Sequence, residues 1–293
     1  MAEKHLDFKV DYTNLSVYDE FNADKLQYPI VLSIPHSGTY FPPEFLQNVC
    51  FDEKVLRRNE DLLVDKLLEN AIAKGLTALK MKISRTFVDL NRDRLELDPA
   101  MFYNYPKEKD ILYDKHCRVG LGVIHRINYR RENIYGGLLD YAEVEERLSK
   151  VYDVYHARLQ QLINKCLKKF GFCVILDCHS MPSKICSIID DRSGIDGCLG
   201  NLFSQSCPQE YSDFLASQFW DNNYSVQENC PYSGAYITFN YCQPKRKMYT
   251  LQLELNRLLY ADEANLCPND EFSEVAEEVS DAVINFAEYL KRL

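Results

Sequence analysis

The stretch Phe172-Cys173-Val174-Ile175-Leu176-Asp177 is the part of the sequence that decides the fold. It is a short, continuous apolar run, which is typical of a central strand that is buried on both faces. Residues 141–170 before it carry apolar residues at helical spacing, and Gly171 suits the end of that helix. A long helix that leads into a buried strand is typical of an α/β fold with a mostly parallel sheet.

The rest of the chain repeats this alternation of short apolar runs and longer helical patterns. The least regular segment, residues 93–135, is a candidate cover for an active site, because long irregular loops are often functional. No repeat, low-complexity tract or linker marks a boundary, so we expect one domain over residues 1–293. We predict further strands over residues 30–34, 78–83, 86–90, 185–189 and 248–255, and helices over 52–73, 210–220 and 271–290.

The composition limits the possible binding partners and the cellular compartment of the protein. The chain has 293 residues, of which 46% are hydrophobic and 27% charged, as in ordinary globular proteins. Its formal net charge of -10 argues against binding to nucleic acid or anionic membranes, so an acidic small-molecule substrate must meet a local cluster of Arg or Lys. We recognise no signal peptide or membrane-spanning run, and no CxxC pair among the cysteines. We therefore expect a cytoplasmic protein with mostly reduced thiols.

Two histidines follow predicted strands. His36 lies in Pro35-His36-Ser37-Gly38, and His179 lies in Asp177-Cys178-His179-Ser180-Met181. In open α/β sheets ligands bind at the carboxyl ends of the strands, so both imidazoles are expected at one edge. A lone histidine there would more often cap its strand, whereas two favour a metal site. Two imidazoles, one carboxylate and a fourth position left to water form the usual catalytic zinc site.

The carboxylate of such a site is expected from Glu60 or Asp61, near the start of the helix predicted over residues 52–73. The alternative role for either side chain is to compensate the positive end of the helix dipole on a solvated face. The residues alone leave the choice between the two open.

Basic residues cluster in Ser84-Arg85-Thr86-Phe87-Val88-Asp89-Leu90-Asn91-Arg92-Asp93. Alternation along an extended segment would put Arg85, Asp89 and Asn91 on one side, with Arg92 at the exit. Arginine forks match carboxylates bidentately, and an asparagine beside them adds an orienting donor. A structural ion pair between Arg85 and Asp89 is the alternative to a substrate role.

Glu254 is an acidic residue in a predicted strand, flanked by Leu253 and Leu255. A buried acid is costly unless it is paired or used, so Glu254 is a candidate general base, or else it pairs with a nearby arginine. The turn in residues 231–238 adds two phenols. Tyr236 is a candidate donor to a substrate, whereas Tyr232 suits half-buried packing.

Taken in this order, the motifs at residues 35–38, 60–61, 85–92, 177–181, 231–238 and 254–257 resemble the N-formylglutamate amidohydrolase family, over roughly residues 28 to 263. That family is similar in fold to the zinc carboxypeptidases and aspartoacylases. The resemblance implies a central mixed sheet with helices on both faces. It also implies one zinc per chain, held by His36, Asp61 and His179.

The resemblance assigns the remaining roles as well. Glu254 would be the base, and Asn91 with Arg92 would hold the substrate carboxylate. Arg85, or Arg126 in the loop of residues 120–126, would serve a second carboxylate or the oxyanion. The sequence departs from the pattern in two places. Its histidine-to-carboxylate spacing is longer than the His-x-x-Glu of carboxypeptidases, and Ala235 stands where a second glycine is expected.

The expected reaction is hydrolysis of N-formyl-L-glutamate to formate and L-glutamate. One alternative is a deacylase of another N-acyl amino acid, and another is a non-catalytic binder of acidic metabolites. A two-manganese ureohydrolase is disfavoured, because Asp177-Cys178-His179-Ser180 offers only one acid. Homo-oligomerisation stays open.

Overall fold

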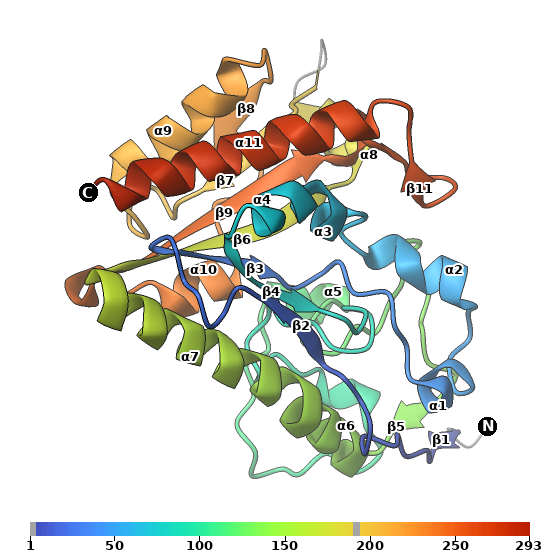
Figure 1. Ribbon diagram of the computed structural model, residues 1–293. Coiled ribbons are helices and arrows are strands. Elements are labelled where there is room, and N and C mark those ends of the chain that lie inside the picture. The colour runs from blue at the N-terminus through green and yellow to red at the C-terminus, as the bar shows by residue number, and fades with distance from the viewer. Residues whose placement is uncertain (1–3, 190–193) are drawn as a thin grey trace. The chain divides into compact units, whose positions relative to one another are not determined.

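The computed structural model describes residues 4–189 and 194–293 (Figure 1). These residues group into two compact units, and the chain passes between the units several times. Unit 1 contains Met1–Asp19, Gly38–Glu60 and Met81–Arg158. Unit 2 contains Glu20–Ser37, Asp61–Lys80 and Leu159–Leu293. The expectation of one domain over residues 1–293 stays a prediction.

The main sheet has the strand order β2-β4-β3-β6-β9-β7-β8. Strands β4, β3, β6 and β9 pair in parallel, whereas β7 pairs antiparallel with β9 and parallel with β8. The predicted mixed, mostly parallel sheet is therefore confirmed. Its strands are β2 (Tyr18–Phe21), β3 (Ile30–Ile34), β4 (Thr77–Met81), β6 (Cys173–Met181), β7 (Gly197–Gly200), β8 (Val226–Glu228) and β9 (Met248–Asn256).

Strand β6 lies at the centre of this sheet, between β3 and β9, and all of its residues are buried. In register, Ile175 lies beside Val31 of β3, and Leu176 lies beside Leu251 of β9. Side chains alternate between the faces of a strand, so one face of β6 carries Val174 and the other carries Asp177 and His179. The central strand thus presents an apolar core on one face and polar groups on the other.

Helices cover both faces of the sheet in unit 2, as predicted (Figure 1). The apolar core forms under α3 (Val64–Leu67), α4 (Glu69–Ala73), α9 (Gln209–Trp220) and α11 (Phe272–Lys291). On the other face, α10 (Tyr236–Tyr241) accepts a hydrogen bond at Thr238 O from Thr250 of β9, 2.7 Å long. That face also receives the part of α7 (Asp153–Phe170) that belongs to unit 2.

Unit 1 has less regular structure. Its short helices are α1 (Pro43–Leu46), α2 (Glu53–Leu56), α5 (Lys115–Val119) and α6 (Tyr141–Arg147), and β1 (His5–Leu6) pairs with β5 (Leu138–Leu139). Its buried centre includes Arg147, which donates to Glu143, to the carbonyl of Phe87 and to the hydroxyl of Tyr135. Residues 93–135 are irregular apart from α5 and the 3-10 turn η2 (Pro99–Met101), in agreement with the sequence.

Two predicted strands are wrong. Residues 86–90 form a turn, in which the amides of Phe87 and Val88 donate to the carbonyl of Ser84. Residues 185–189 belong to α8 (Ser183–Ile189), because a short apolar run fits a helix as well as a strand. The start of α8 is stabilised by Glu263, which accepts hydrogen bonds from the amide and the hydroxyl of Ser183.

The helix predicted over residues 52–73 is interrupted. It consists of α2, the 3-10 turn η1 (Arg57–Asn59), α3 and α4. Leu63 has a left-handed backbone, with φ of 59°, which no α-helix accommodates. Asp61 therefore lies in the break between η1 and α3.

Within residues 4–189 and 194–293, no helix is both long and apolar enough to cross a bilayer. All eleven cysteines are free thiols. The antiparallel pair β10 (Ala261–Asp262) and β11 (Cys267–Pro268) and the 3-10 turns η4 (Pro244–Arg246) and η5 (Arg257–Leu259) complete the elements around β9.

Candidate metal centre

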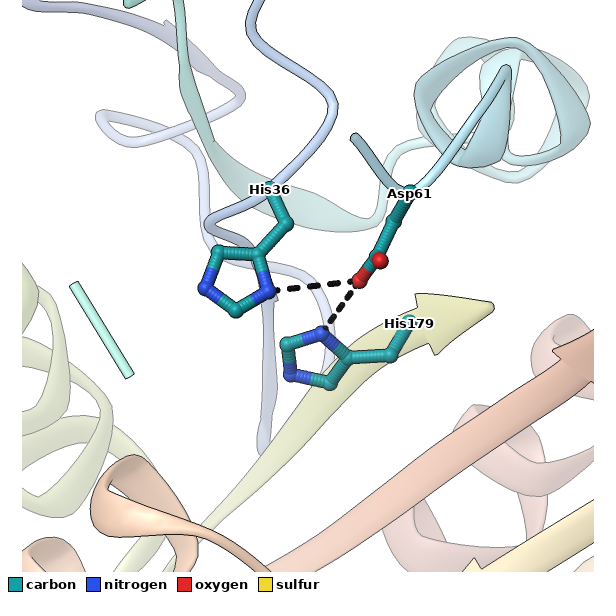
Figure 2. Close-up of side chains that lie close together, drawn as sticks. All are labelled: His36, Asp61 and His179. Atoms are coloured by element: carbon teal, nitrogen blue, oxygen red, sulfur yellow. Dashed lines mark hydrogen bonds and ion pairs between the residues drawn. The ribbon is translucent and has the colours of Figure 1, made fainter. Parts of the chain in front are cut away.

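His36, Asp61 and His179 come together in unit 2 (Figure 2). His36 follows β3, Asp61 lies in the break before α3, and His179 lies on β6. The chain segments are tied to each other directly, because the amide of Asp61 donates to the carbonyl of His36 at 3.1 Å. Ser37 adds a hydrogen bond from its hydroxyl to the carbonyl of Asp61, at 3.2 Å.

Both imidazole rings lie close to the same carboxylate oxygen. Asp61 Oδ2 lies 3.3 Å from His36 Nδ1 and 2.7 Å from His179 Nδ1, as the dashed lines in Figure 2 show. The candidate ligand atoms of the three residues all lie within 4.8 Å of one another. Each residue is at most 3% exposed. This is the spacing that a single ion can bridge, among side chains that are almost fully buried.

Asp177 holds the far side of the His179 ring. Its Oδ2 lies 2.8 Å from Nε2, so Nε2 is placed to donate to Asp177, and Nδ1, which faces Asp61, is the nitrogen that an ion would bind. Burial lowers the pKa of His179, but the charges of Asp177 and Asp61 outweigh burial and raise that pKa well above its usual value. The surroundings of this ring therefore favour positive charge.

Arg257 binds the second oxygen of Asp61. Its Nη2 lies 3.2 Å from Asp61 Oδ1, and its Nε donates to the hydroxyl of Ser180 at 2.9 Å. This leaves Oδ2 directed at the imidazoles. Sequence reasoning did not assign Arg257 to the site, although its position directly after β9 was a usable signal.

The donor set fits a zinc ion. Two imidazole nitrogens and one carboxylate oxygen are the protein ligands of open catalytic zinc sites, and a carboxylate behind a ligating histidine is their usual support. Of the acidic pair, Asp61 is the residue in reach. Glu60 instead lies 3.2 Å from Arg57 Nε, and both of those residues belong to unit 1.

Glu254 lies on β9 as the Cα partner of His179. Partners in neighbouring parallel strands project to the same face, so Glu254 shares the polar face of the sheet with His179. It is 7% exposed, and its Oε1 accepts a hydrogen bond of 2.6 Å from Gln252 Nε2.

Tyr236 is the first residue of α10 and is half-buried. The residue before it, Ala235, has an extended backbone with φ of -123°, which any amino acid adopts. A glycine is required only at Gly234, where φ is +127°. The alanine therefore imposes no strain on this turn.

The remaining candidates belong to unit 1, where Asp89 joins several of them. Its Oδ2 lies 2.7 Å from Arg85 Nη2 and 3.0 Å from His125 Nε2, and its Oδ1 accepts from the amide of Asn91 at 2.8 Å. The ion pair of Arg85 and Asp89 is thus present, across a turn and not along the extended segment that we expected. His125 is buried in this group.

The other two arginines have backbone or acidic partners within unit 1. Arg92 donates from Nε to the carbonyl of Leu121 at 3.0 Å and from Nη1 to the carbonyl of Asn91 at 2.8 Å. Arg126 Nε lies 3.3 Å from Asp98 Oδ2. Both guanidinium groups are therefore oriented by the fold.

A second group of ligand-type side chains, Glu96, Asp114 and His116, lies in unit 1. His116 Nδ1 is 3.1 Å from Glu96 and 2.7 Å from Asp114, and Asp114 also caps α5. Burial raises the pKa of Asp114, but the amide of Cys117 and the charge of His116 outweigh burial and lower it. These contacts describe an ion cluster that stabilises the start of α5.

Comparison with known proteins links this chain to one family. Residues 28–261 match the family model described as N-formylglutamate amidohydrolase. The chain is 29% identical over 240 residues to the N-formylglutamate deformylase of Pseudomonas aeruginosa, which covers 80% of this chain and 83% of that protein. It is 24% identical over 238 residues to the N-formylglutamate deformylase of Pseudomonas putida, covering 80% and 82%.

Solved structures show the same likeness. The crystal structure of N-formylglutamate amidohydrolase from Ralstonia eutropha JMP134 superposes with a TM-score of 0.88 and 27% identity, over 95% of this chain and 99% of that one. A gene product from Agrobacterium tumefaciens superposes with a TM-score of 0.62 and 18% identity, over 94% and 98%, which extends the likeness of fold.

Proposed function

The chain belongs to the N-formylglutamate amidohydrolase family, and from this premise we propose that it is a zinc-dependent enzyme that hydrolyses N-formyl-L-glutamate to formate and L-glutamate. The observation that carries the proposal is the convergence of His36 Nδ1 and His179 Nδ1 on Asp61 Oδ2. The named deformylases among its relatives support the choice of substrate.

The proposed cofactor is one zinc ion per chain, held by His36, Asp61 and His179. When bound, the ion would supply a Lewis acid for the amide carbonyl and for the attacking water. Asp177 keeps Nδ1 of His179 as the ligating nitrogen, and Arg257 keeps Asp61 Oδ2 directed at the rings. Both supports act through existing hydrogen bonds, so the ligands are ordered before any ion binds.

Glu254 is the proposed general base and acid. Its carboxylate removes a proton from the attacking water, and the oxygen of the resulting hydroxide bonds to the acyl carbon. When the carbon–nitrogen bond breaks, Glu254 returns the proton to the leaving amine. Its position beside His179 on the same face of the sheet supports this role.

Basic residues are the proposed partners of the substrate carboxylates. We assign Asn91 and Arg92 to one carboxylate, and Arg85 or Arg126 to the second carboxylate or the oxyanion. Tyr236 is a proposed donor to the substrate. Two hydrogen bonds from Arg85 to Asp89 fix the direction of its guanidinium group.

The proposal also covers partners and location. We propose a small acidic substrate, no nucleic acid or membrane partner and a cytoplasmic location, in line with the net charge of -10. Homo-oligomerisation is left to measurement.

The test is product release from a panel of N-acyl amino acids that includes N-formyl-L-glutamate, N-formyl-L-aspartate, N-acetyl-L-glutamate and N-formyl-L-leucine. Formate, acetate and amino acid are quantified with zinc-loaded protein. We expect equal amounts of formate and glutamate from N-formyl-L-glutamate, at the highest kcat/KM of the panel. A protein that hydrolyses none of these compounds would contradict the proposal, and a preference for the acetyl compound would move it to another deacylase.

A further inference from the structure

The polar face of β6 and β9 carries a compact group of four side chains. In register, Asp177 lies beside Gln252, and His179 lies beside Glu254. All four residues are buried, from 0% exposed for Asp177 to 7% for Glu254.

Gln252 is an amide side chain at a buried strand position, and its hydrogen bonds give it one orientation. Residues two apart in a strand project to the same face, so Gln252 Nε2 reaches Glu254 Oε1 at 2.6 Å. Because an ionised carboxylate only accepts, the amide nitrogen must face Glu254, and Oε1 then accepts a hydrogen bond from the hydroxyl of Thr238 at 3.4 Å. Thr238 is in turn anchored, because the hydroxyl of Thr250 donates to its carbonyl.

We propose that Gln252 is a positioning residue that holds the Glu254 carboxylate in the rotamer from which it moves protons. The inference rests on the proposed function, since it assigns the general base to Glu254. A hydrogen bond to Oε1 restricts rotation of the carboxylate group. Such fixed orientation contributes to the rate, because a catalytic group loses activity when its supporting contacts are loose.

The neutrality of Gln252 suits this role. A lysine or arginine at the same distance would form an ion pair and make Glu254 a weaker base. A glutamate would put a third carboxylate beside Asp177 and Glu254, and like charges at such spacing destabilise each other. An amide donor orients the carboxylate without changing the net charge of the group.

The first experiment compares Gln252→Met, which keeps the size of the side chain and removes the donor, with the unchanged zinc-loaded protein. We expect kcat to fall about 10- to 100-fold, as for the loss of one hydrogen bond to a charged group, while KM and bound zinc stay unchanged. Gln252→Asn, whose shorter amide cannot span the distance, serves as a second variant with the same expected loss if the methionine variant does not fold. An unchanged kcat in a folded variant would overturn the inference.

The matched control is Ser206→Ala. Ser206 donates a buried hydrogen bond, also 2.6 Å long, to the carbonyl of Thr250 on the same strand. Its loss should lower Tm and leave kcat unchanged, which is the result of a merely structural role. If Gln252→Met and Ser206→Ala show the same pattern, Gln252 is structural and the inference is wrong.

A double-mutant cycle separates this inference from the proposed function. If Gln252 acts through Glu254, adding Gln252→Met to Glu254→Gln should change kcat less than about 2-fold, because coupled residues are not additive. An equal loss in both backgrounds would show that Gln252 acts elsewhere and would overturn the inference. A fully active Glu254→Gln enzyme would instead refute the proposed role of Glu254, whatever Gln252 does.

Discussion

The imidazole of His179 is held between two carboxylates, with Asp177 Oδ2 lying 2.8 Å from its Nε2. The two residues are two positions apart on β6, so their side chains share one face of the strand. Asp177 thereby decides which ring nitrogen is available to an ion. Without it, the ring could take either tautomer or rotate.

Asp177→Asn is therefore expected to weaken zinc binding about 10- to 100-fold, the usual effect of losing a carboxylate behind a ligating histidine. The measurement is competition for zinc with a chelator of known affinity. Asp196→Asn is the matched control, because Asp196 is an aspartate of unit 2 whose Oδ2 accepts hydrogen bonds from the amide and the hydroxyl of Ser225, at 2.8 and 2.9 Å. Equal zinc affinity of Asp177→Asn and unchanged protein would remove Asp177 from the support of the site.

Removal of a ligand should empty the site. We expect His36→Ala and His179→Ala to lose bound zinc, measured by elemental analysis after dialysis. Asp61→Asn should lose more zinc than Glu60→Gln, because Asp61 Oδ2 lies beside Nδ1 of both rings, whereas Glu60 pairs with Arg57. The opposite order of zinc loss would identify Glu60 as the carboxylate ligand. Full zinc content in His179→Ala would refute the assignment of the site.

Glu254→Gln tests the base. The substitution keeps the size of the side chain but removes the proton acceptor, so kcat should fall by about 10²-fold or more while zinc content is kept. If Glu254 were only a structural partner, Tm would fall and substantial kcat would remain. Steady-state kinetics, zinc content and Tm of this one variant distinguish the two roles.

Arg92→Lys tests the substrate carboxylate. A lysine cannot reproduce the planar fork, so KM for N-formyl-L-glutamate should rise on the order of 10-fold. Arg94→Lys is the control, because Arg94 pairs with Glu145 and Asp153 within unit 1. A KM that stays unchanged in Arg92→Lys for every compound of the panel would exclude Arg92 from substrate binding.

The buried His125 should make the stability of the protein depend on pH. Burial lowers the pKa of His125 to about 4, against the opposing effect of Asp89, whereas a histidine in the unfolded chain titrates near 6.5. Between these two pH values the unfolded chain binds more protons than the folded one. The free energy of unfolding should therefore fall as pH decreases from about 6.5 to 4, by up to about 1 kcal/mol per pH unit.

Urea unfolding across this pH range measures the effect. His125→Gln should show a shallower slope than unchanged protein, whereas His5→Gln, at an exposed histidine, should keep the original slope. Parallel slopes in all three proteins would show that His125 does not titrate between the folded and unfolded states.

The sequence predicts the central part of this fold well. The run at residues 172–177 becomes β6, because a strand that is buried on both faces needs an unbroken apolar sequence. The amphipathic patterns of residues 141–170 and 271–290 also correspond to helices, although a π-helical segment, η3 (Leu148–Tyr152), interrupts the first. Long periodic segments carry enough residues to distinguish a period of 3.6 from a period of 2.

Short segments are where the sequence is ambiguous. Residues 185–189 are apolar and few, so period alone does not separate a helix from a strand, and the bond between Ser183 and Glu263 is a tertiary contact. No local sequence pattern predicts the left-handed backbone of Leu63 either. The same limit applies to the turn at residues 86–90, whose hydrogen bonds to Ser84 compete with an extended conformation.

For the site, the motifs identify the candidate ligands but not their supports. His36 and His179 stand out because they follow apolar strands. The supporting roles of Arg257 and Gln252 follow from their distances to Asp61 and Glu254, which join Arg257 to a segment far away in the chain and Gln252 to a neighbour on its own strand. Alternation on β9 does place Gln252 on the side of Glu254, and that signal was available from sequence.

The most direct test of the account follows formate release from N-formyl-L-glutamate by one protein sample as its metal is removed and restored. We predict that chelation abolishes formate release, and that one equivalent of zinc per chain restores it without refolding. Undiminished formate release by protein that elemental analysis shows to be free of metal would contradict the central claim.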